Sequence, residues 1–207
     1  MIFSLPIADI LHSEILLQDD FTTNIRGWEI TEDEEEKSFI KDSHYWMENK
    51  SESRWMFYHK KLPIKKEDNF IIMAQIDLLN HQGYGQYGLV WGFDKEHKIL
   101  NRFSVSVEST RLSICRFEKN HRSIFHRFSN QYEKGMNSNN KQFFSIMRIE
   151  DYYYFFLHKD KRPMYICHTS QLCMDGLRFG FYLEPGIMIR CDKITVKRLI
   201  LNKGFTG

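Results

Sequence analysis

The feature that most constrains the fold is a long succession of short apolar segments separated by tight turns. Leu100–Glu108 is the clearest example, because Phe103, Val105 and Val107 would face one way and the residues between them the other. Arg111–Phe117 follows after a short gap, which predicts an antiparallel hairpin. Roughly 11 such segments occur, with almost no helical periodicity. The pattern predicts an all-β protein, built as an antiparallel two-sheet β-sandwich or jelly roll.

The other predicted strands are rich in aromatic and β-branched residues and end at turn-forming residues. They are Ser38–Lys41, Tyr45–Asn49, Arg54–His59, Phe70–Leu79, Tyr87–Phe93, Gln142–Ile149, Tyr152–His158, Leu177–Leu183 and Ile187–Leu199. The polar residues 130–140 predict a loop, and Asp42-Ser43 predicts a turn. Because no linker rich in Pro, Gly or Ser interrupts this series, residues 18–207 are predicted to form one domain.

Residues 1–17 form a lead segment with a different pattern. Ser4 and Pro6 fit the first turn of a helix. A stripe with helical spacing follows, made of Ile7, Ile10, Leu11 and Ile15. A short helix is therefore predicted over residues 4–17. The segment would either cover one end of the sandwich, as a helix or a strand, or dock a partner.

Charge and composition favour an ordinary soluble protein. Residues 1–100 hold 11 Lys and Arg against 18 Asp and Glu, a formal charge of −7, whereas residues 101–207 hold 18 against 9, a charge of +9. The two halves of a sandwich interleave in space, so this split is a weak indication of a charged partner. Basic residues beside aromatic ones, such as Arg116 and Phe117, would suit single-stranded nucleic acid. An antiparallel sheet with one wet face gives the same pattern, so nucleic acid is not expected.

The start of the chain lacks the basic region of a signal peptide, and no apolar stretch is long enough to span a membrane. We therefore expect a cytoplasmic protein whose four cysteines are reduced.

Five landmarks occur in a fixed order. They are Asp19-Asp20-Phe21 with Gly27-Trp28, Asn69-Phe70 through Asp77, Tyr87–Asp94, Leu100–Val107, and Gly180-Phe181 with Asp192–Val196. Together they resemble the concanavalin A-like lectin/glucanase family, including the laminin-G-like and 3-keto-disaccharide hydrolase-like domains of bacterial proteins, over residues 18–200. The resemblance implies a concanavalin A-like sandwich with a ligand surface on its concave sheet. It implies no single activity, because these folds serve sugar binding, peptide binding and glycoside hydrolysis.

No catalytic residues are predicted. A retaining glycosidase needs two carboxylates about 5 Å apart, and laminarinase-type sandwich enzymes place theirs as E-x-D-x-E on one strand. The corresponding strand, Phe70–Leu79, carries only Asp77. The acidic run Glu32–Glu36 is consecutive, so its side chains diverge in a predicted hairpin loop.

No metal or cofactor is predicted either. Asp94, Glu96 and Asn101 lack the spacing of a calcium loop. Cys167 and Cys173 are not spaced as a pair of zinc ligands.

The candidate ligand surface consists of aromatic and polar residues on neighbouring strands. Sugar rings stack on aromatic side chains while polar groups bind their hydroxyls, although aromatic residues on strands equally often pack in a core. The candidates are Tyr84, Tyr87, Trp91, Arg102, Ser104 and Tyr182. We predict a non-catalytic recognition module that binds a carbohydrate or a protein partner through the concave sheet face. The alternatives are a divergent glycoside hydrolase and an intracellular protein-assembly subunit without a small ligand.

Overall fold

Two antiparallel sheets make up the computed structural model, which describes residues 10–61, 64–94, 99–108, 111–118, 121–129, 141–157, 162–172, 174 and 176–202. The nine-stranded sheet contains β1 (Ile10–Asp19), β2 (Thr31–Glu32), β3 (Glu36–Lys41), β4 (His44–Asn49), β6 (Phe70–His81), β11 (Lys141–Ile149), β12 (Tyr152–Leu157), β13 (Tyr165–His168) and β15 (Ile187–Leu201). The six-stranded sheet contains β5 (Met56–Lys61), β7 (Gln86–Asp94), β8 (Ile99–Ser106), β9 (Arg111–Glu118), β10 (His121–Ser129) and β14 (Arg178–Leu183).

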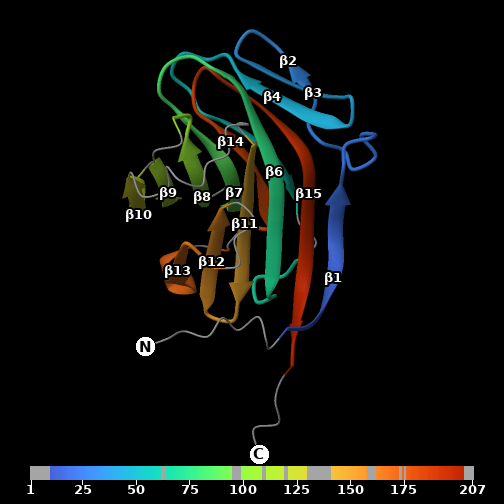
Figure 1. Cartoon of the computed structure of the whole chain (residues 1–207), viewed down its shortest axis with the longest axis vertical. Helices are drawn as coiled ribbons and strands as arrows, with labels where there is room; N and C mark the ends of the chain where they lie inside the picture. Colours follow the sequence, from blue (N-terminus) through green and yellow to red (C-terminus); the bar gives the residue numbers. More distant parts are fainter. Residues whose placement is uncertain are drawn as a thin grey trace, which may run out of the picture.

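The strand order in the larger sheet is β13-β12-β11-β6-β15-β4-β3-β2, with β1 also paired to β15. In the smaller sheet the order is β10-β9-β8-β7-β14-β5. Figure 1 shows the sheets as two layers, with the six-stranded sheet behind the long strands β6 and β15. The predicted all-β, two-sheet antiparallel sandwich is confirmed.

The first described strand corrects the helix prediction. Residues 10–19 form β1 and pair with β15, so the helix is wrong for residues 10–17, while residues 4–9 lie outside the described residues. The pairing register shifts between Ile10 and His12 and again between Ile15 and Leu17. A bulge inserts an extra residue and breaks the two-residue alternation by which a strand is recognised. The segment therefore lacks the regular alternation of a strand.

Most other strands form where they were predicted, with ends shifted by a few residues. The strands β2 and β13 were not predicted, and the predicted loop at 130–140 lies outside the described residues. Asp42 and Ser43 have φ angles of 51° and 56° and form the predicted two-residue turn between β3 and β4.

The core lies between the sheets and is largely aromatic. Phe103 of β8 contacts Phe144 of β11 and Phe155 of β12, with ring centroids 5.3 Å apart in both pairs. The predicted alternation on β8 places Phe103 in this core and turns Arg102 and Ser104 to the outer face of the six-stranded sheet. Every residue of β8 is nevertheless buried, so that outer face is itself covered.

The landmark Asp19…Trp28 has a packing role. Asp19 accepts hydrogen bonds from the Trp28 indole N–H at 2.7 Å and from the Phe21 backbone N–H at 2.9 Å. The Phe21 and Trp28 rings are buried against Tyr45. These residues fix the chain that follows β1 onto the core.

Candidate functional site

The outer face of the six-stranded sheet is concave. Trp55, just before β5, and Phe117 of β9 have ring centroids 5.3 Å apart, although three strands lie between β5 and β9. In a flat sheet these strands would be about 19 Å apart, since neighbouring strands are spaced by about 4.8 Å. The two rings meet because the sheet curves toward this face. Gly88 of β7 accommodates the crowding, because a Cβ atom there would collide with the carbonyl oxygen of Phe103.

Aromatic side chains cover the middle of this concave face. The Trp55 ring lies 4.6 Å from the Phe57 ring and 6.1 Å from the Tyr182 ring, measured between centroids. Trp55 is 42% exposed, whereas Tyr182 is buried, so Trp55 is the outer layer of this cluster. The polar groups beneath these rings are therefore shielded from solvent.

Arg102 is the principal polar group under the rings, at 1% exposure. Its guanidinium carbon lies 4.3 Å from the Tyr182 ring centroid and 5.3 Å from that of Phe117, within the range of cation–π attraction. Nη1 donates to Glu184 Oε1 at 3.2 Å, and Nη2 donates to Gln86 Oε1 at 3.1 Å. The buried cation is thus compensated by a carboxylate, an amide oxygen and two ring faces.

Two further buried hydroxyls orient the same acceptors. Tyr182 donates to Glu184 Oε1 at 2.7 Å, and Ser104 donates to Gln86 Oε1 at 2.9 Å. Glu184 and Gln86 are only partly buried, so they connect the buried network with the surface. Hydrogen bonds from the buried Arg102, Ser104 and Tyr182 fix the positions of these two side chains. A protein usually pre-organises a binding group in this way.

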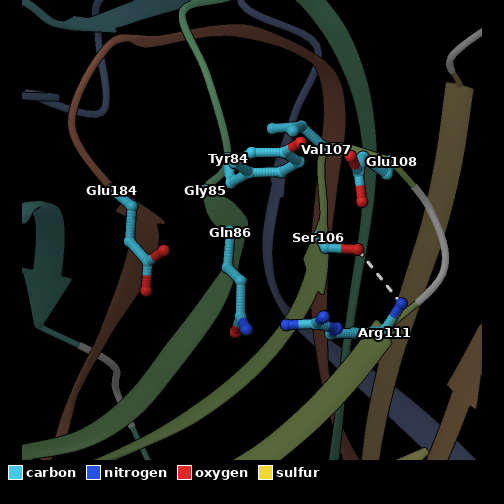
Figure 2. Close-up of a pocket in the computed structure, with 8 residues that line it drawn as sticks. All are labelled: Tyr84, Gly85, Gln86, Ser106, Val107, Glu108, Arg111 and Glu184. Atoms are coloured by element: carbon cyan, nitrogen blue, oxygen red, sulfur yellow. Dashed lines mark hydrogen bonds between the residues drawn. The ribbon is translucent and has the colours of Figure 1, made fainter. Parts of the chain in front are cut away.

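The Gln86 and Glu184 side chains line a pocket of about 390 Å³ at one end of the concave sheet. Its lining includes Tyr84, Gln86, Ser106, Glu108, Arg111 and Glu184. Figure 2 shows the Arg111 side chain extending toward Gln86, with the Tyr84 ring on the opposite side beside Val107. The Tyr84 side chain is 87% exposed. The pocket volume lies near the lower limit for small-molecule sites.

The six predicted ligand residues occupy three different environments. Tyr84 lines the pocket. Arg102, Ser104 and Tyr182 lie under the concave face and hold the pocket's acceptors in place, as described above. Tyr87 and Trp91 point the other way, into the core, because alternate residues of β7 face opposite sides of the sheet.

Tyr87 packs on Phe144, and Trp91 packs on Tyr153 and Phe155. Neither side chain is part of the concave surface.

The prediction missed several polar pocket residues and one exposed aromatic residue: Gln86, Ser106, Glu108, Arg111, Glu184 and Trp55. Glu184 could have been found, because it lies two residues after Tyr182 and so faces the same way. Trp55 lies in the predicted strand Arg54–His59, two residues before Phe57, so its face was also readable. Its contact with Phe117 of β9 was not, because that contact depends on the curvature of the sheet.

Asp77, the acid on the strand where catalytic carboxylates were sought, does not line this pocket. Asp77 is on the outer face of the nine-stranded sheet, where Arg190 donates to its Oδ2 at 2.8 Å. No group of three or more His, Cys, Asp or Glu side chains that could hold a metal ion occurs among the described residues. The Asp94 side chain, Glu96 and Cys173 lie outside them.

Three cysteines are free and buried: Cys115, Cys167 and Cys191. Burial raises the pKa of the Cys167 thiol to about 12 and also raises the pKa of Cys191, so both thiols are protonated at neutral pH. Within the described residues, no helix has the length and apolar character needed to cross a membrane.

Sequence comparison identifies no relative: no protein-family model matches the chain, and no curated protein matches it. Solved structures do share its fold. The CBM2 module of the evolved Dit of Lactobacillus casei BL23 phage J-1 has a TM-score of 0.64 and 11% identity, over 93% of this chain and 98% of that chain.

Two further structures are similar over nearly their whole lengths. A Bacillus subtilis protein of unknown function with a galectin-like fold has a TM-score of 0.62 and 10% identity, over 91% of this chain and 97% of its own. The endo-β-1,3-glucanase of Pyrococcus furiosus has a TM-score of 0.60 and 10% identity, over 92% and 96%. The fold is therefore the jelly-roll, concanavalin-like sandwich that carbohydrate-binding modules, galectin-like proteins and endoglucanases share. At these identities the likeness concerns the fold alone.

Proposed function

We propose that this chain is a non-catalytic domain that binds carbohydrate in the pocket lined by Tyr84, Gln86, Glu108, Arg111 and Glu184. One observation carries the proposal: the exposed Tyr84 ring and the Glu184 carboxylate, which buried groups hold in place, line the same pocket. Carbohydrates present apolar C–H faces, which stack on aromatic rings, and hydroxyls, which donate to carboxylate and amide oxygens. Tyr84 supplies the ring and Glu184 supplies an acceptor. The Gln86 Oε1 already accepts from Arg102 and Ser104, so Gln86 supplies its amide N–H groups as donors.

The fixed position of Glu184 supports a binding role. Immobilising a flexible side chain on binding costs about 0.5–1.5 kcal/mol. Arg102 and Tyr182 already hold Glu184 Oε1 at 3.2 and 2.7 Å before any ligand arrives. A sugar hydroxyl would therefore meet an acceptor that needs little reordering. The likeness of the fold to a CBM2 module is consistent with such a role.

The competing function is glycoside hydrolysis, because two carboxylates, Glu108 and Glu184, line the pocket. Hydrolysis needs an acid and a second carboxylate on opposite sides of one glycosidic bond. Glu184 already accepts hydrogen bonds from Arg102 and Tyr182, which ties it to the protein rather than to a reacting group. We therefore favour binding and use turnover as the discriminating measurement.

A glycan array followed by calorimetry on the best ligand tests the proposal. Tyr84→Ala should weaken binding at least tenfold, about 1.4 kcal/mol, because the stacking surface is lost. Tyr152→Ala is the matched control, since Tyr152 is an exposed tyrosine on β12 of the other sheet, and it should bind like the unmodified protein.

Two results would contradict the proposal. One is the absence of any glycan ligand, or equal binding by the Tyr84→Ala variant. The other is release of reducing sugar that Glu108→Gln abolishes, which would make the domain an enzyme.

A further inference from the structure

A second pocket, of about 300 Å³, lies at the same end of the sandwich. Its lining includes Glu48, Lys50, Glu52, Asn80, Gln82 and Gly186. These residues come from the end of β4, the loop before β5, the end of β6 and the turn before β15. All but Gly186 carry polar or charged side chains, and the pocket's volume is again near the lower limit for a small-molecule site.

The two pockets share their dividing wall. In the turn between β14 and β15, Glu184 lines the first pocket, and the next two residues, Pro185 and Gly186, line the second. In the loop between β6 and β7, Gln82 lines the second pocket and Tyr84 the first. A wall one or two residues thick therefore separates them along both loops.

Backbone hydrogen bonds hold this wall in place. The Gln82 N–H donates to the Gly186 carbonyl at 2.9 Å, and the Gly186 N–H donates to the Asn49 carbonyl at 2.9 Å. The Glu184 N–H donates to the Gln86 carbonyl at 3.0 Å. Gly186 has a φ of 70°, in the region that favours glycine, so the turn is built for this shape. The two pockets thus keep a fixed separation.

The surroundings of the pockets are acidic. The acidic turn between β2 and β3 adjoins the second pocket, because the Lys50 Nζ donates to the Asp33 carbonyl at 3.1 Å and the Lys50 N–H to the Glu35 carbonyl at 2.8 Å. This region comprises the lining of both pockets, the buried Arg102, Arg54 and residues 32–37, and it holds nine carboxylates and five cationic side chains. The carboxylates are Glu32, Asp33, Glu34, Glu35, Glu36, Glu48, Glu52, Glu108 and Glu184, and the cations are Lys37, Lys50, Arg54, Arg102 and Arg111. A site with this excess of negative charge repels anionic ligands.

We infer that the two pockets are neighbouring subsites for one extended glycan, and that this glycan is neutral or carries amino groups rather than sulfate or uronate groups. The inference rests on the proposed function and adds the chain length and charge class of the ligand. A single monosaccharide would fill one pocket only. Two fixed pockets, each with several polar side chains in its lining, instead match successive segments of a chain that crosses the Glu184–Gly186 turn, with a disaccharide in the first pocket and further units in the second.

Calorimetry with a neutral oligosaccharide series tests the length of the site. The probes are the disaccharide, tetrasaccharide and hexasaccharide of the neutral or amino-sugar chain that binds best on the array. The hexasaccharide should bind about tenfold more tightly than the disaccharide, equal to 1.4 kcal/mol. The double variant Asn80→Ala/Gln82→Ala should remove this gain and leave disaccharide binding unchanged. Gln18→Ala, an exposed glutamine of β1, is the control and should keep the gain.

The outcomes separate the inference from the proposal on which it rests. If all three lengths bind equally, or if the double variant changes nothing, the second subsite is wrong while the first pocket stands. If Tyr84→Ala leaves disaccharide binding unchanged, the proposed function itself fails. Heparin oligosaccharides serve as the anionic probe, and binding of them as tight as that of the neutral hexasaccharide would overturn the charge class.

Discussion

Each of the two sheets carries an arginine paired with a carboxylate on its outer face, and the two pairs differ in burial. On the six-stranded sheet, Arg102 is 1% exposed and lies under aromatic rings. On the nine-stranded sheet, the Arg190 side chain is 30% exposed, although it also makes two hydrogen bonds to Asp77 and lies over the Trp46 ring. The arginine is thus fully buried in one pair and partly exposed in the other, whereas Asp77 is the more buried of the two carboxylates.

The cluster around Arg190 spreads its charge over several partly exposed groups. Asp192 accepts from Lys141 at 2.6 Å, and the His44 Nε2 lies 3.3 Å from its other oxygen. The hydrogen bond to Asp192 raises the pKa of the Lys141 ammonium, so Lys141 remains charged across the neutral range. Water completes the solvation of such groups, and exposed pairs of this kind contribute little to stability. The Arg102 guanidinium has no such access to water, so its charge is compensated only by the protein groups around it.

The largest effect is expected for Arg102→Ala. Removing one partner of a buried pair and the packing of its side chain should lower the free energy of unfolding by about 3–5 kcal/mol. Denaturant unfolding measures this, with Arg116→Ala as the control, because Arg116 pairs with the exposed Glu118. The control should lose less than about 1 kcal/mol. Equal losses of unfolding free energy in the two variants would show that the burial of Arg102 does not strengthen its contribution to stability.

A smaller effect is expected for Glu184→Gln. This variant keeps the shape of the side chain and removes the charge that compensates Arg102, so the free energy of unfolding should fall by about 1.5–3 kcal/mol. Glu108→Gln changes the same pocket without touching Arg102 and should leave thermal unfolding nearly unchanged. If both variants unfold alike, Glu184 does not stabilise the buried guanidinium.

The smallest effect is expected for Arg190→Ala, a loss of about 1 kcal/mol that depends on salt. The Arg190 guanidinium is partly exposed, and Lys141, whose Nζ lies 3.7 Å from Asp77 Oδ1, still compensates the buried carboxylate in this variant. The Debye length falls from about 10 Å at 0.1 M salt to about 3 Å at 1 M, so the loss should shrink in high salt. The loss caused by Arg102→Ala should persist there, because buried pairs are screened much less. Chemical unfolding in urea at both salt concentrations makes the comparison. A salt-independent loss at Arg190 would remove the distinction between the two faces.

Local alternation was sufficient to predict much of the fold. The strand that became β8 was readable because Phe103 and Val105 alternate with Arg102 and Ser104, and its partner β9 begins a few residues later at Arg111. Where bulges interrupt the alternation, as in β1 between Ile15 and Leu17, the same reasoning gave a helix. A bulge depends on pairing with β15, nearly two hundred residues away in the chain, which no local pattern records.

In the candidate site, too, local sequence determined some features and long-range pairing determined others. The sequence by itself determined that Arg102, Ser104 and Tyr182 lie on strands with one polar face, because side chains alternate along a strand. Only the tertiary structure decided that the sheet curves, that Trp55 contacts Phe117 across it, and that Tyr87 and Trp91 face the core. It also brought Tyr84, Arg111 and Glu184 to one pocket. The physical reason is that curvature and burial arise from pairing between strands distant in the sequence, whereas alternation is a property of each strand alone.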